Sequence, residues 1–193
     1  QDDNLKSHIG DGTGLDPVKM IMDDTGMNEE DARQVIRDMW DWSAGDFKGI
    51  RQGKEGITER IENFIEKSPK YDGKVYRGIV VDEKTANGIF EDLKNGKSVN
   101  QNGIASWSTD KDYATEFVDM YKSERMQDGV GIVFYLKDNE SGVSIKHIAE
   151  IDNNEVISPS KARYSLDGEI KLIHDPYDGD YYLVPVTEKK RKK

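Results

Sequence analysis

At residues 74–81 the chain reads KVYRGIVV, a run of strand-forming residues with an arginine in its middle. Side chains alternate between the two faces of a strand, so Val75, Arg77, Ile79 and Val81 share one side. Burying a charge without a partner costs several kcal/mol, so a guanidinium on that apolar side requires one. The partner is either an internal carboxylate or an anionic ligand, and this stretch alone leaves both alternatives open.

The sequence patterns before and after this stretch differ. Before it, Asp16-Pro17 is typical of a helix start, and apolar residues recur at helical spacing after Asn28 and again over residues 57–65. A short helical piece is predicted near residues 47–51. After it come short apolar runs separated by turn signals, with helices predicted near residues 83–94 and 110–125. Helices followed by a strand-rich mixed half predict an α+β fold.

Further strands are predicted at residues 103–107, 130–137, 143–147, 155–157, 162–166, 169–174 and 181–186. Asp167-Gly168 and Asp178-Gly179 are predicted to join the last strands as hairpins. We expect a flexible lead-in over residues 1–15 and one domain over 16–187, followed by a basic tail over 188–193. Within the domain, residues 16–70 form the helical part and 71–187 the mixed β core. Because Gln1 is not an initiator methionine and no signal peptide is visible, we expect a processed product or a piece of a longer chain.

The charge of the chain argues against nucleic acid as its partner. The formal net charge is −10, and residues 189–193 alone carry five positive charges, so the rest of the chain carries −15. Binding to a nucleic-acid backbone depends on cations, so only the tail is a candidate for such contacts, and a solvated terminus is the simpler interpretation. There is no cysteine, and no run approaches the ~20 apolar residues of a membrane span. We therefore expect a soluble chain without a metal site. The histidines match no catalytic or metal-binding spacing: His8, His147 and His174.

Two polar motifs follow the arginine strand. Ser106-Trp107-Ser108-Thr109 stands where a strand meets a helix, and Thr109 with Asp112 predicts a capping box. Local structure therefore accounts for Ser108 and Thr109 but leaves Ser106 unexplained. Glu155 follows the turn at residues 152–154 and opens the next strand, a position that is often only a rim residue.

These motifs, in this order, resemble those of the arginine-serine-glutamate class of mono-ADP-ribosyltransferases, which includes bacterial binary toxins and C3-like exoenzymes. The matching segments are Val75-Tyr76-Arg77-Gly78, Ile104-Ala105-Ser106-Trp107-Ser108 and Asn153-Asn154-Glu155-Val156. The sequences of these motifs are most similar to those of ADP-ribosyltransferase domains attached to phage head-assembly proteins. In this chain Trp107 replaces the middle threonine of the family's serine motif. Asn153 replaces the Gln or Glu that stands two residues before the family's catalytic glutamate.

The resemblance implies a fold and a set of roles. N-terminal helices would pack on two small, roughly perpendicular mixed sheets, with NAD bound as substrate in the cleft between them. Glu155 would stabilise the cationic ribose formed when the bond to nicotinamide breaks, and Ser106 would orient Glu155. Arg77 would bind the phosphates of NAD, and the backbone of Gly78 would hold the nicotinamide amide.

Other residues have weaker implied roles. Ser43 and Arg51 are candidates for the adenosine-phosphate side of NAD. Phe117 is a candidate to stack on nicotinamide, although it also fits the apolar face of its helix. Asn153 would lie on the acceptor side, where the shorter amide cannot act as a base.

The predicted function is transfer of ADP-ribose from NAD to a protein acceptor, with arginine as a candidate, by a phage-encoded protein or one delivered into a target cell. The alternatives are an NAD glycohydrolase, in which water replaces the acceptor, and a phage structural or interaction domain without useful catalysis.

Overall fold

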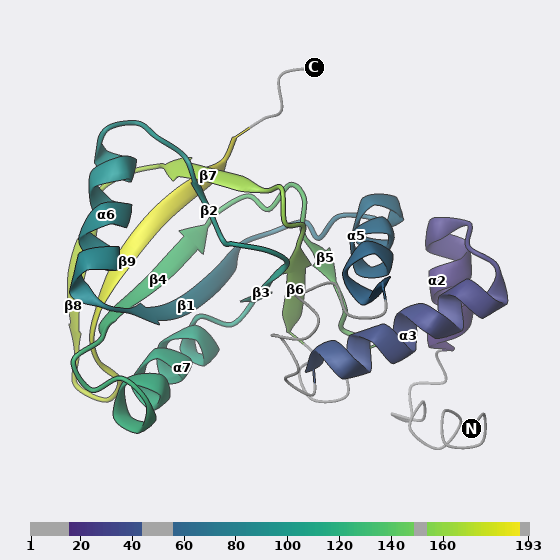
Figure 1. Ribbon diagram of the computed structural model, residues 1–193, viewed down its shortest axis with the longest axis horizontal. Helices are drawn as coiled ribbons and strands as arrows, with labels where there is room; N and C mark the ends of the chain where they lie inside the picture. The colour runs from purple at the N-terminus through teal and green to yellow at the C-terminus, as the bar shows by residue number, and fades with distance from the viewer. Residues whose placement is uncertain (1–15, 44–55, 149–153, 190–193) are drawn as a thin grey trace.

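The computed structural model describes residues 16–43, 56–148 and 154–189 of the chain. The helices α2 (Pro17–Thr25), α3 (Glu29–Ser43) and α5 (Ile57–Lys67) precede the first strand, where the apolar spacing predicted helices (Figure 1). Asp16 begins α2 by accepting hydrogen bonds from the backbone N–H groups of Val18 and Lys19, at 3.0 and 3.4 Å. The short helical piece predicted near residues 47–51 lies outside the described residues.

The remaining described elements are α6 (Glu83–Lys94), α7 (Lys111–Glu124) and the strands of a 9-stranded sheet. The strands are β1 (Val75–Val81), β2 (Val99–Asn100), β3 (Ala105–Ser108), β4 (Val130–Leu136), β5 (Val143–Ser144), β6 (Glu155–Ser158), β7 (Arg163–Leu166), β8 (Lys171–Asp175) and β9 (Gly179–Glu188). Their hydrogen-bonded order is β2-β7-β9-β4-β1-β3-β6-β5, with β8 paired to β9. Only β4 and β9 pair in parallel among these strands. The α+β class is therefore confirmed.

β1 is the strand that connects the two parts of the sheet. It pairs with β4 along its whole length but with β3 at a single position, where Tyr76 lies opposite Ser108. Figure 1 shows β5 and β6 beside α3 and α5, whereas β4 and β9 lie toward α6 and α7. The two small sheets that the resemblance implied are thus two parts of one hydrogen-bonded sheet, joined at one residue pair.

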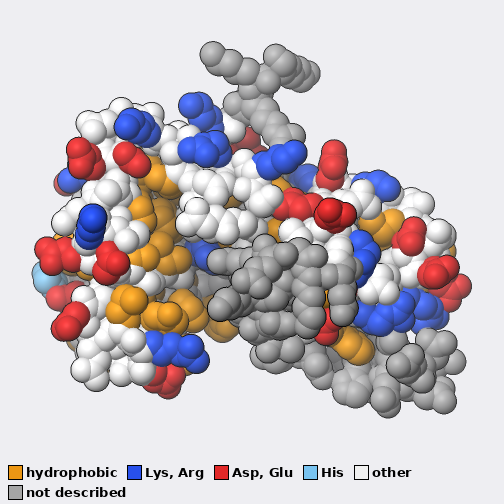
Figure 2. Space-filling view, viewed as in Figure 1, with side chains coloured by type: hydrophobic (Ala, Val, Ile, Leu, Met, Phe, Trp, Pro, Cys, Tyr) orange, Lys and Arg blue, Asp and Glu red, His pale blue; other side chains and the backbone are white. Residues whose placement is uncertain are grey.

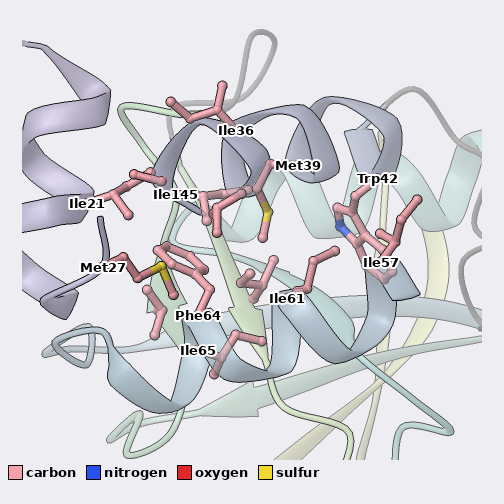
Figure 3. Packing of buried hydrophobic residues seen from close by; sticks show 14 of the residues in the cluster. Ile21, Met27, Ile36, Met39, Trp42, Ile57, Ile61, Phe64, Ile65 and Ile145 are labelled. Atoms are coloured by element: carbon pink, nitrogen blue, oxygen red, sulfur yellow. The ribbon is translucent and has the colours of Figure 1, made fainter. Parts of the chain in front are cut away.

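Buried side chains form separate clusters on the two faces of β3 and β6. Ile104 and Ile157 belong to a cluster with the apolar faces of α2, α3 and α5, and Figure 3 shows Met39, Trp42, Ile61 and Ile145 within it. The neighbouring residues Ala105, Trp107 and Val156 belong instead to a second cluster, with Val75, Ile132, Phe134, Leu136, Val184 and residues of α6. The alternation of side chains along β3 and β6 therefore holds both clusters against one pair of strands.

A third cluster lies between α7 and the sheet. It contains Ala114, Val118, Val133 and Tyr181, with Tyr76 and Val80 partly buried against it. Val75, Ile79 and Val81 belong to the second cluster instead, so the predicted alternation along β1 is confirmed. Arg77, by its place in the strand, shares the side of that second cluster.

Local sequence signals were wrong at two positions. The N-cap of α7 is Asp110, whose side chain accepts from the Asp112 N–H at 2.9 Å, rather than Thr109. Ser108 Oγ accepts from the Asp110 N–H at 3.0 Å, between the end of β3 and the start of α7. The turn at residues 167–168 does not make a hairpin, because β7 and β8 both pair with β9 and not with each other. The hairpin predicted at residues 178–179 is confirmed by the pairing of β8 with β9.

No helix among the described residues is both long and apolar enough to cross a membrane.

Candidate active site

The strand register brings the arginine, serine and glutamate motifs together. Ser108 of β3 lies opposite Tyr76 of β1 on one side and opposite Glu155 of β6 on the other. Tyr76, Ser108 and Glu155 thus form a row across the three strands. Arg77 directly follows the first of these residues, and Ser106 lies two residues before the second. Segments that are distant in the sequence therefore meet across three neighbouring strands.

Ser106 and Glu155 form the shortest link in the site. Ser106 Oγ donates a hydrogen bond of 2.6 Å to Glu155 Oε1, a distance typical of a hydroxyl bound to a carboxylate. The Glu155 backbone is held as well, because its carbonyl accepts from the Ile145 N–H at 3.1 Å. One residue earlier, the Asn154 carbonyl accepts from the Thr109 N–H at 2.9 Å. Glu155 is half-buried, and its carboxylate is anchored by Ser106.

Arg77 is also half-buried, and it contacts the serine strand. Its Nη1 donates to the backbone carbonyl of Ser106 at 2.8 Å, and its Nε donates to Gln101 Oε1 at 2.9 Å. The guanidinium is thus tied to the same residue whose hydroxyl binds Glu155. Arg77, Ser106 and Glu155 therefore lie together, as the resemblance requires.

Sequence reasoning missed Gln101. It lies between β2 and β3 in the run Asn100-Gln101-Asn102-Gly103, whose composition predicts a turn and nothing more. A glutamine in such a run carries no signal that its side chain reaches a strand 24 residues away in the sequence. Only the tertiary structure shows this contact.

Packing explains why residue 78 is a glycine. A Cβ at this position would lie 2.4 Å from the Ala114 carbonyl oxygen and 2.9 Å from Val118 Cγ2. The close approach that glycine permits here is that of α7 against β1. A contact between the Gly78 backbone and nicotinamide stays a prediction.

Trp107 is a buried core residue of the second cluster. It is 2% exposed, its ring packs against Tyr164 at a centroid distance of 5.1 Å, and its Nε1 donates to Ser158 Oγ at 3.0 Å. Burial raises the pKa of the Tyr164 hydroxyl above its ordinary value. Trp107 thus occupies the threonine position of the motif as a core residue.

The weaker candidates are only partly placed. Ser43 ends α3, and its hydroxyl is buried without a hydrogen-bond partner in the described structure. The adjacent Trp42 is buried in the cluster that the helices α2, α3 and α5 form with Ile104 and Ile157. Arg51 and Asn153 lie outside the described residues.

Phe117 does not belong to the buried face of α7. That face consists of Ala114, Thr115 and Val118, whereas Phe117 is half-buried and contacts Tyr121 at a centroid distance of 5.8 Å. Figure 2 shows hydrophobic side chains at the surface between α6 and α7. A role for Phe117 at nicotinamide stays a prediction.

Two hollows lie away from these residues. One, of about 300 Å³, is lined by α2, α5 and the β5 region, including Ile21, Phe64 and Val143. The other, of about 980 Å³, lies between α5 and the β6–β7 connection and has a mixed charged lining that includes Glu62, Lys161 and Glu188. Neither is lined by Arg77, Ser106 or Glu155.

The comparisons with known proteins identify the fold. No protein-family description matches the sequence, and no curated protein matches it either. Among solved structures, the chain is similar to Vis toxin, an ADP-ribosyltransferase from Vibrio splendidus, with a TM-score of 0.56 and 18% identity over 97% of this chain and 81% of that one.

An ADP-ribosyltransferase from Clostridium botulinum gives a TM-score of 0.55 at 14% identity, over 92% of this chain and 97% of that one. The ADP-ribosylating toxin BECa of C. perfringens, solved with NADH, gives 0.54 at 14% identity, over 80% of this chain and 43% of that one. The chain therefore has the fold of the ADP-ribosyltransferase toxins, which confirms at the level of the fold what its sequence motifs indicated.

Proposed function

We propose that this chain is an NAD-dependent mono-ADP-ribosyltransferase that transfers ADP-ribose to a protein. The observation that carries the proposal is the 2.6 Å hydrogen bond from Ser106 to Glu155, made beside the guanidinium of Arg77. It occurs in a chain with the fold of enzymes of that activity, one of which, BECa, was solved with NADH.

The chemistry follows from the charges that develop on the substrate. The bond between nicotinamide and ribose breaks, its electron pair leaves with nicotinamide, and the ribose becomes an oxocarbenium-like cation. The carboxylate of Glu155 stabilises that cation electrostatically, and the hydroxyl of Ser106 keeps the carboxylate in place. The acceptor then contributes a lone pair to the ribose carbon and loses a proton. Arg77 binds the pyrophosphate, since its planar fork matches phosphate oxygens.

A guanidinium is the acceptor group that we favour. Vis toxin, with 18% identity to this chain, was also solved in complex with agmatine, a small guanidine compound. The body of this chain is strongly acidic once the basic tail is set aside, and this charge favours approach of a cationic acceptor.

Hydrolysis of NAD is the second candidate. It is favoured by Asn153, whose short neutral side chain stands where the family has Gln or Glu and cannot act as a base toward an acceptor. Water would then take the place of the protein nucleophile.

Incubation with NAD labelled in its adenosine half, together with bacterial and eukaryotic lysates, tests the proposal. Label on protein supports transfer, free labelled ADP-ribose supports hydrolysis, and neither product contradicts both. The Glu155→Gln protein is assayed in parallel, and any label that it transfers to protein measures the labelling that does not depend on this site.

A further inference from the structure

The guanidinium of Arg77 is held from two sides by oxygen atoms of one short segment. Nη1 donates to the carbonyl of Ser106, in β3, and Nε donates to the side chain of Gln101, in the link that leads into β3. A planar guanidinium fixed at Nε and at Nη1 has little rotational freedom left. Gln101 and the Ser106 carbonyl therefore both help to set the plane of the Arg77 guanidinium.

The chemistry of the two groups fixes how Gln101 is oriented. A guanidinium can only donate hydrogen bonds, so the amide oxygen of Gln101 must face Arg77, and the amide NH₂ must face elsewhere. No described residue accepts a hydrogen bond from that NH₂, and Gln101 is half-buried rather than fully enclosed. An amide at this place thus orients the cation without contributing a negative charge of its own. It also leaves N–H donors beside the cation.

The backbone around Gln101 is held in place by Asn100. The Asn100 Nδ2 donates to the carbonyls of Ser160 and Ala162 at 2.6 and 3.0 Å, and its Oδ1 accepts from the Asn102 N–H at 2.7 Å. Asn102 has a φ of 58°, a conformation that asparagine tolerates better than most residues. These bonds tie the link to the β6–β7 connection. A side chain whose backbone is held in this way can preorganise its partner.

We propose that Gln101 is a positioning residue that orients Arg77 toward the pyrophosphate of NAD. The inference rests on the proposed function, because it concerns the same substrate site. It adds to that function a specific requirement for a neutral amide at position 101.

A double-mutant cycle on NAD affinity tests this role. We expect Gln101→Ala to raise the Kd for NAD about tenfold, the scale of one hydrogen bond to a charged group. Its effect on kcat for NAD cleavage is expected to stay within about twofold, because the contact does not involve the reacting bond. In the Arg77→Ala background the same change is expected to alter Kd by less than about twofold, since the group it positions is gone.

Gln101→Glu separates positioning from a purely structural role. The carboxylate keeps an acceptor for Nε, so the melting temperature stays at or above that of the unaltered protein. It also brings a negative charge next to the pyrophosphate, so we expect Kd to rise at least as much as in Gln101→Ala. Gln127→Ala, which removes a glutamine located after α7 and away from the site, is the matched control and is expected to change neither quantity.

The outcomes are distinguishable by calorimetric titration with NAD. If the unaltered protein binds no NAD, the proposed function and this inference both fail. If it binds NAD and the Gln101→Ala and Gln101→Glu proteins bind like Gln127→Ala, only the inference fails. An equal effect of Gln101→Ala with and without Arg77 also overturns it.

Discussion

The hydroxyl of Ser106 donates a 2.6 Å hydrogen bond to Oε1 of Glu155, a residue 49 positions later in the sequence. The two side chains lie on adjacent strands, two residues apart in the register, because Ser106 is directly opposite Ile157 and Glu155 is directly opposite Ser108. Such a diagonal pair is within reach of a serine and a glutamate side chain. The carboxylate thus has a fixed position before any substrate binds.

We expect Glu155→Gln to lower the turnover of NAD at least ~10²-fold, because one preorganised electrostatic stabiliser of the transition state is removed. The melting temperature is expected to remain close to that of the unaltered protein, since the amide can still accept from Ser106. Turnover is measured as release of nicotinamide. Full activity in this protein would remove Glu155 from the mechanism.

Ser106→Ala is expected to have a smaller effect, roughly tenfold on turnover, because the carboxylate keeps its charge and loses only an orienting bond of about 1–2 kcal/mol. The same nicotinamide assay measures it. Ser108→Ala is the comparison, because the Ser108 hydroxyl accepts from the Asp110 N–H, just before α7 begins. A larger loss of turnover for Ser108→Ala than for Ser106→Ala would contradict this assignment.

Gly78→Ala is expected to destabilise the protein by about 1–3 kcal/mol, as overpacking does in a close-packed interior. The added methyl group would meet the backbone carbonyl of Ala114 at 2.4 Å, so α7 has to move away from β1. Gly88→Ala is the matched control in α6, because nothing lies within 4 Å of a Cβ there. It is expected to stabilise the protein by roughly 0.5–1 kcal/mol, the usual gain in a helix interior. Urea unfolding measures both changes in free energy, and equal signs would contradict the prediction.

Asp38 links the helices α3 and α5. Its carboxylate is 1% exposed and accepts from Arg60 Nε at 2.7 Å, from Arg60 Nη2 at 2.9 Å and from Gln34 Nε2 at 3.0 Å. We expect Asp38→Ala to cost about 1–2 kcal/mol in the free energy of unfolding, because it removes a buried acceptor of three hydrogen bonds, while the Arg60 side chain, which is 38% exposed, regains part of its hydration. Glu29→Ala, which removes the exposed ion pair with Arg33, is the control and is expected to cost less than ~0.5 kcal/mol.

Asp82 makes the stability of α6 dependent on pH. Its side chain accepts from the Thr85 N–H at 2.7 Å at the helix start, and this hydrogen bond lowers the pKa of the carboxyl below its ordinary value of 3.8. A lowered pKa in the folded state means that the stabilisation is present above pH 3.8 and is lost as the pH falls through the lowered value. Asp82→Asn retains an acceptor but does not titrate. The melting temperature of the unaltered protein is therefore expected to fall more steeply in acid than that of Asp82→Asn, and parallel curves would contradict this.

Local patterns predicted most of the elements because each depends on residues that are near one another in the chain. The helix over residues 83–94 has both boundaries as predicted, with Asp82 as its N-cap and Gly96 beyond its end. The predictions failed for two reasons. At the start of α7 two residues could act as N-cap, and Asp110 does so rather than Thr109. The strand β2 has only two residues, which is too short to give a periodic pattern.

For this protein the sequence by itself determined the class of the fold, the alternation of faces along β1 and the order of an arginine, a serine and a glutamate. These follow from spacing and residue type, which act locally. Only the tertiary structure decided that Glu155 accepts from Ser106, that Gln101 holds Arg77, and that the space at Gly78 is occupied by α7. Such contacts depend on strand register and helix packing. These are fixed by the burial of side chains from the whole domain, which no short stretch of sequence specifies.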